Sequence, residues 1–111
     1  MARYVPRKGD LVELSFRRDH GHEQHGRHPA LVVSNDPFQR ATGLCVVCPV
    51  TRTGRQHPLH VPIPPGIGVD GVVMADQLRS VDARARGARR LARAPDALLD
   101  EVLAIVDAML F

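Results

Sequence analysis

Apolar and polar positions alternate over much of the chain up to residue 81, and this period of two residues predicts β-strands. A first strand is expected over 11–16, where Leu14 and Phe16 alternate with polar neighbours. A second strand is expected over 30–34, whose continuous apolar run indicates burial on both faces. The segment 17–28 between them is polar and is expected to form a loop.

Three further strands are expected over 43–50, over 57–63 and over a fifth, bent segment that includes 71–75 and 78–81. Two prolines in 57–63 favour a sheet edge, because proline cannot donate a hydrogen bond to a ladder. A short helical turn is expected over 37–41, directly after the turn-forming residues Asn-Asp-Pro.

The pattern changes at Pro95, after which apolar residues recur at helical spacing and acidic residues occupy the other face. Proline suits the first helical position, and acids near the start of a helix interact favourably with its dipole. The sequence therefore predicts a mainly β domain spanning 1–111: a small, half-open barrel of about five antiparallel strands with a C-terminal α-helix.

Charge is distributed unevenly along the 111 residues, although the net charge is only +3. Residues 1–93 carry 15 basic and 8 acidic side chains, whereas 94–111 carry four acidic and no basic ones. A basic body is compatible with a polyanionic partner. There is no charged start followed by an apolar run and no apolar stretch of bilayer length, so we expect a soluble, cytoplasmic protein without a membrane partner.

Two groups of residues resemble sites that bind metals or carry out redox chemistry. Cys45 and Cys48 lie three apart in an apparent buried strand, so their thiols should point to opposite faces and act as core residues. The histidines of the polar loop, at positions 20, 22, 25 and 28, match the spacing of no common metal site. Neither group is expected to bind a metal or another cofactor.

The segment 21–34 is the densest in the chain in groups that transfer protons or bind phosphate, and it leads into a longer resemblance. The chain resembles the MazF/PemK toxins of bacterial toxin–antitoxin pairs. The matching stretches are Pro6-x-x-Gly9-Asp10-Leu11-Val12, Gly21-His22-Glu23-Gln24, Pro29 to Ser34, Pro49-Val50-Thr51, Gly71 to Asp82 and Ala85-Arg86-Gly87.

This resemblance implies an SH3-like barrel with a C-terminal helix, a homodimer and a type II toxin that cuts single-stranded RNA, including mRNA, at specific short sequences. It implies metal-independent cleavage by attack of the 2′-hydroxyl, which leaves a 2′,3′-cyclic phosphate. It also implies a cognate MazE- or PemI-like antitoxin, whose disordered tail lies over the RNA groove.

One position departs from the family pattern, which has arginine directly before proline as the principal catalytic residue. Here that position is His28, and Arg27 lies one place earlier. A residue before proline is held extended, so His28 should inherit the direction of that arginine and Arg27 should point the opposite way. Three interpretations follow: His28 performs the acid–base chemistry, Arg27 swings in, or activity is reduced.

The resemblance assigns the remaining site residues. Thr51 and Glu23 are expected to be catalytic with His28, although a strand-ending threonine and a solvated carboxylate are the ordinary alternatives. Gln77 can pair with a base edge, and the arginines after it can follow a phosphate backbone. The expected RNA-binding residues are Phe16, His22, Gln24, Arg27, Arg52, Gln77, Arg84 and Arg86.

A second class of function is a non-catalytic, CcdB-like toxin of the same architecture that binds a protein such as DNA gyrase. Such a toxin needs no acid–base groups. The polar loop that precedes Pro29 favours the ribonuclease, and so does Thr51. The absence of an arginine directly before Pro29 favours the binding toxin.

Overall fold

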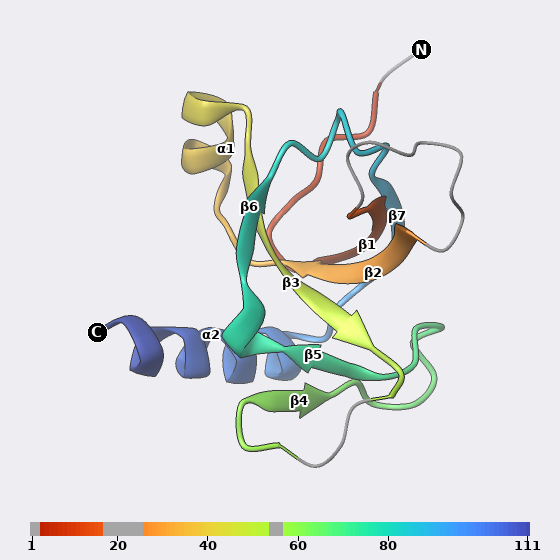
Figure 1. Cartoon of the computed structure of the whole chain (residues 1–111), viewed down its shortest axis with the longest axis vertical. Helices are drawn as coiled ribbons and strands as arrows, with labels where there is room; N and C mark the ends of the chain where they lie inside the picture. Colours follow the sequence, from red (N-terminus) through yellow and green to blue (C-terminus); the bar gives the residue numbers. More distant parts are fainter. Residues whose placement is uncertain (1–2, 17–25, 54–56) are drawn as a thin grey trace.

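The computed structural model describes residues 3–16, 26–53 and 57–111, which form one bent antiparallel sheet and a C-terminal helix (Figure 1). In the sheet, the strand order is β4-β5-β3-β2-β1-β7, and β6 pairs with β3. The strands are β1 (Asp10–Ser15), β2 (Arg27–Val32), β3 (Cys45–Thr51), β4 (His60–Pro62), β5 (Val72–Met74), β6 (Arg79–Val81) and β7 (Arg89–Arg93). The helices are α1 (Asp36–Thr42), the 3₁₀ turn η2 (Ala75–Gln77) and α2 (Asp96–Leu110).

This architecture confirms the predicted mainly β fold with a C-terminal helix, and the sheet is not closed within the described residues. The expected number of strands was wrong in two places. The bent fifth strand is two strands, β5 and β6, which η2 separates and which pair with different halves of β3. The strand β7 was not expected, because Arg89-Arg90-Leu91-Ala92-Arg93 has three arginines and no clean alternation.

The strand β2 begins at Arg27, three residues earlier than predicted, because β1 continues to pair with it. Leu14 lies opposite His28, and Ser15 lies opposite Arg27. The segment expected to be the end of a loop is therefore strand, and this fixes the direction of both side chains.

Alternation along the central strands builds two apolar clusters on opposite faces of the sheet. The first includes Leu11, Leu31 and Cys48, and the buried side of α2 covers it through Leu98 and Val102. The second contains Val12, Leu14, Ala30, Val32, Cys45, Val47, Val81 and Ala83. Figure 1 shows α2 running along one side of the sheet, beside β4 and η2.

The two cysteines lie in different clusters, which confirms that they occupy opposite faces of β3. Both are buried and free. Burial, and then the charge of Asp82, raises the pKa of Cys45 to about 11. Burial, and then the charge of Asp76, raises the pKa of Cys48 to about 12. Both thiols are therefore neutral at ordinary pH.

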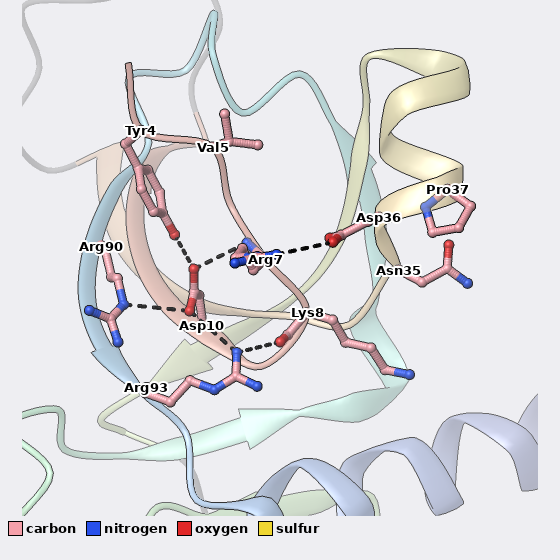
Figure 2. A pocket seen from close by; sticks show the side chains of 10 residues that line it. All are labelled: Tyr4, Val5, Arg7, Lys8, Asp10, Asn35, Asp36, Pro37, Arg90 and Arg93. Carbon is pink, nitrogen blue, oxygen red and sulfur yellow. Dashed lines mark hydrogen bonds and ion pairs between the residues drawn. The ribbon is translucent and has the colours of Figure 1, made fainter. Parts of the chain in front are cut away.

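A buried carboxylate joins β1, β7 and the segment before β1 (Figure 2). Asp10 is only 4% exposed, and it accepts hydrogen bonds from the Tyr4 hydroxyl at 2.5 Å and the Arg7 backbone N–H at 3.1 Å. Its Oδ1 lies 3.5 Å from Arg90 Nε and 3.5 Å from Arg93 Nη1. Burial and the hydrogen bond to Asp10 raise the pKa of the Tyr4 hydroxyl above its ordinary value.

The residue before this carboxylate has a left-handed backbone conformation, which favours glycine. Gly9 has a φ of +94°, and a Cβ there would lie 2.8 Å from the Arg93 guanidinium carbon. Its backbone also joins distant elements, because Gly9 N–H donates to Val32 O and Gly9 O accepts from Ala94 N–H, both at 2.8 Å. Gly9 therefore lets Arg93 approach Asp10 closely.

Within the described residues, no helix has both the length and the apolar character that crossing a bilayer requires.

The substitution Asp10→Ala should destabilise the protein by about 2–4 kcal/mol, because it leaves the half-buried Tyr4 hydroxyl without its acceptor and removes the carboxylate that Arg90 and Arg93 share. The free energy of unfolding, measured in urea, tests this. Asp36→Ala is the matched control, since the Arg7–Asp36 pair is exposed and should contribute about 1 kcal/mol or less. Equal losses in the two variants would contradict a central role for Asp10.

The two thiols should react slowly with iodoacetamide at pH 8. Their raised pKa values keep them protonated there, and only a thiolate attacks. We expect native protein to be alkylated at least about 100-fold more slowly than urea-unfolded protein, which is the control. Rapid alkylation of either cysteine in native protein, located by peptide mass mapping, would show that its environment is not the buried one described.

Candidate active site

Strand register brings two of the predicted catalytic residues to the same face of the sheet. Pairing of β1 with β2 sets Leu14 opposite His28, and pairing of β2 with β3 sets Ala30 opposite Pro49. His28 is two positions before Ala30, and Thr51 is two positions after Pro49. Since residues two apart share a face, the register puts His28 and Thr51 on one face at the ends of adjacent strands.

An aromatic ring and a guanidinium complete this arrangement. The Phe16 ring centroid lies 6.2 Å from that of His28, and the Arg79 guanidinium carbon lies 5.1 Å from the Phe16 centroid. The second distance is that of a cation–π contact. His28 and Arg79 are exposed and Phe16 is half-buried, so all three are open to a ligand.

Arg79 was expected only as one of the arginines after Gln77 that could follow a phosphate backbone, and its place beside Phe16 was not predicted. The position of Arg79 depends on the pairing of β6 with β3, in which Arg79 lies opposite Val47. These two strands are distant in the sequence. The alternation of Arg79 with the buried Val81 was the local signal that it shares the face of the second cluster.

The backbone of Thr51 is fixed by a close approach of β5. Gly71 has a φ of +128°, and a Cβ there would lie 2.5 Å from the Thr51 carbonyl oxygen. The Thr51 hydroxyl accepts from the Thr53 N–H at 3.2 Å and lies 3.1 Å from the Thr53 hydroxyl. Its hydroxyl is thus held at the strand end, and the following Arg52 is exposed.

Arg27 points away from His28, as its position one residue earlier predicts. Its Nε lies 3.2 Å from Glu13 Oε1, and its Nη2 donates to the Gly87 carbonyl at 2.9 Å. Arg89 binds the same Glu13 oxygen at 2.8 Å. These contacts hold the Arg27 guanidinium on the opposite face, so it could reach the face of His28 only if they broke.

The arginines after Arg79 differ in their partners and in their exposure. The half-buried Arg86 donates to the Ser15 carbonyl at 3.0 Å, which holds the turn before β7 against β1. Arg84 is exposed and lines a separate groove of about 700 Å³ with residues of the N-terminal segment, including Tyr4. Arg89, Arg90 and Arg93 pair with the acids of β1.

The other predicted residues lie near this site or outside the described ranges. Gln77 is exposed at the end of η2, two positions before Arg79. His22, Glu23 and Gln24 fall within 17–25, which the structure does not describe.

Within the described ranges, a single group combines three side chains that can ligate a metal: His57, His60 and Asp76. It lies on the segment leading into β4 and on η2, and it includes none of the predicted catalytic residues.

The candidate active site offers an imidazole, a hydroxyl, a guanidinium and an aromatic ring, which together can transfer protons, bind an anion and stack with a base.

Comparison with known proteins gives a consistent result at the level of sequence. A family described as the PemK-like, MazF-like toxin of type II toxin–antitoxin systems has a model that matches residues 7–110. The endoribonuclease toxin MazF of Escherichia coli K12 is 40% identical over 90 residues, which are 81% of this chain and 80% of MazF. The endoribonuclease PemK of Escherichia coli is 41% identical over 101 residues, covering 86% of this chain and 75% of PemK.

Solved structures agree with this. MazF from Deinococcus radiodurans superimposes with a TM-score of 0.86 at 46% identity, covering 97% of this chain and 98% of that one. The MazE-MazF structure from the same organism gives a TM-score of 0.85 at 42% identity and covers 97% of both chains.

Proposed function

The chain belongs to the family of PemK-like, MazF-like toxins of type II toxin–antitoxin systems, and we propose that it is an endoribonuclease that cleaves single-stranded RNA at specific sequences. The observation that carries this proposal is the strand register. It supports a shared face for His28 and Thr51, with the Phe16 ring and the Arg79 guanidinium beside His28. A binding toxin requires no such combination.

In the proposed reaction, the 2′-hydroxyl of RNA attacks the adjacent phosphorus and the bond to the 5′-oxygen breaks. The products are a 2′,3′-cyclic phosphate and a 5′-hydroxyl. One group must take the proton of the 2′-hydroxyl, and another must protonate the leaving oxygen. We assign these two transfers to His28 and Glu23. Neither transfer requires a metal ion or another cofactor.

The remaining groups stabilise charge and position the RNA. The Thr51 hydroxyl exchanges its Thr53 contacts for a phosphate oxygen, and the Arg79 guanidinium offsets the negative charge that develops at phosphorus. The Phe16 ring provides a surface on which a base can stack. Gln77 reads a base edge through its amide, since it is exposed close to Arg79 in the chain.

The geometry narrows the three interpretations of the missing arginine. Because Arg27 is bound to Glu13 and Gly87, the interpretation in which it swings in loses support. The other two interpretations remain: His28 performs the acid–base chemistry, or cleavage is slower with His28 than it would be with an arginine. Both can be tested by substituting His28.

The wider RNA contacts and the partners follow from the family. We propose that the cognate antitoxin is MazE- or PemI-like and that its disordered tail covers the RNA-binding face. We also propose that the toxin is cytoplasmic and that it is a homodimer, in which residues 1–111 of each copy form one domain. The solved MazE-MazF structure supports the antitoxin partner. The RNA contacts proposed besides Phe16 and Gln77 are His22, Gln24, Arg52, Arg84 and Arg86, of which Arg52 and Arg84 are exposed. Arg27, the remaining expected contact, would meet RNA only on the face opposite His28, where Glu13 and Gly87 hold it.

The proposed function is tested by incubating the protein with a long single-stranded RNA in EDTA and mapping the ends. We expect discrete cuts with 2′,3′-cyclic phosphate ends. Thr51→Ala should slow cleavage by about 100-fold, the typical effect of removing one donor to a developing oxyanion. Thr42→Ala, at the exposed end of α1, is the matched control and should cleave normally. Intact RNA at every concentration would favour the CcdB-like alternative instead.

Substitution of His28 separates its two remaining interpretations. His28→Ala should slow cleavage by about 100-fold or more if the imidazole transfers a proton. His28→Arg should speed cleavage by about tenfold if a guanidinium fork at this position holds phosphate better. Single-turnover rates on one short RNA measure both effects. Unchanged rates in both variants would remove His28 from the catalytic site.

A further inference from the structure

Two histidines and an aspartate gather away from the proposed ribonuclease site. His57 precedes β4, His60 begins it, and Asp76 lies in η2. One ligand atom from each side chain lies within 4.8 Å of the other two. The His57 and His60 rings stack with centroids 4.2 Å apart, and His60 Nε2 lies 3.3 Å from Asp76 Oδ1.

The inner atoms of this group lack hydrogen-bond partners. Among the described residues, His60 Nδ1, His60 Nε2 and Asp76 Oδ1 are buried and accept or donate no hydrogen bond. The contact of 3.3 Å between His60 and Asp76 is short enough for an ion pair, but it does not meet the geometry of a hydrogen bond. Unsatisfied buried polar atoms are costly, so their grouping needs a physical reason.

The surrounding backbone holds the two segments together. The Ala75 N–H donates to the Leu59 carbonyl at 3.1 Å, so η2 is tied to the turn that leads into β4. The strand β4 is also paired with β5, and His60 lies opposite Met74. His60 and Asp76 are therefore brought together by strand pairing and not by a flexible loop.

We propose that His57, His60 and Asp76 bind a divalent transition metal ion of the zinc class. Two imidazoles and one carboxylate form a donor set typical of zinc, and water would occupy the fourth position. Zinc bonds of about 2.0–2.1 Å place tetrahedral ligands about 3.3–3.4 Å apart. The separation of His60 Nε2 and Asp76 Oδ1 already has this value.

His57 is the ligand that must adjust. Its Nδ1 accepts a hydrogen bond from the Leu59 N–H at 3.1 Å, and the stacked ring must turn away from His60 to share an ion. His57 is exposed, so this rotation disturbs no core packing. The ion would then join β4 to η2 as a structural clamp, and this inference does not depend on RNA cleavage.

The test is calorimetric titration of Zn²⁺ into untagged, metal-free protein. We expect one ion per chain and a higher Tm when the ion is bound. We expect zinc affinity to fall at least about tenfold in each of three variants, His57→Gln, His60→Gln and Asp76→Asn. A loss of this size is already seen when a residue that only hydrogen-bonds to a metal ligand is replaced. Co²⁺ should give the visible bands of a tetrahedral site, and H57Q should change them.

The control is a triple variant of the polar loop, His20→Gln, His22→Gln and His25→Gln, which should bind Zn²⁺ as the parent does. Since His57 is exposed, H57Q tests the site even if substitutions in β4 or η2 impair folding. Three results would overturn the proposal: no binding by the parent, unchanged affinity in H57Q, or loss of binding in the loop variant. Cleavage of RNA by the parent protein in EDTA is measured separately, and its outcome does not depend on any of these three results.

Discussion

The buried carboxylate of Asp10 is the constraint on which the rest of the sheet depends. A carboxylate that is 4% exposed is tolerated only with partners, and here these come from two directions. Tyr4 and the Arg7 backbone bind it from the N-terminal segment, and Arg90 and Arg93 approach it from β7. The carboxylate thus holds the final strand against the first.

This edge of the sheet also determines where α2 begins. The Ala94 N–H donates to Gly9 O, so the chain leaves β7 directly beside the turn that precedes Asp10. The helix then starts at Asp96 and covers the apolar face that includes Leu11 and Leu31. With that face closed by α2, the opposite face is the one that presents the candidate active site at the strand ends.

Local periodicity was sufficient to predict the elements whose apolar positions recur regularly, but not those defined by distant partners. The helix from Asp96 and the central strands were correctly expected, because the regular spacing of their apolar residues along the chain predicts which side chains are buried. The strand β7 was missed, since its arginines are accommodated by Asp10 and Glu13 about 80 residues earlier. The place of Arg79 beside Phe16 was not predicted for the same reason, because this contact joins segments that are distant in the sequence.

The position of Arg79 bears on how a histidine can replace an arginine before Pro29. An arginine there would combine charge with hydrogen-bond donors in one side chain, whereas an imidazole transfers protons well but holds phosphate poorly. In this chain, His28 and Arg79 lie near the same Phe16 ring, at 6.2 and 5.1 Å. In the reaction proposed above, the two tasks are therefore divided, with proton transfer assigned to His28 and a permanent positive charge to Arg79. Because β2 and β6 position these side chains independently, the division requires no change in the fold.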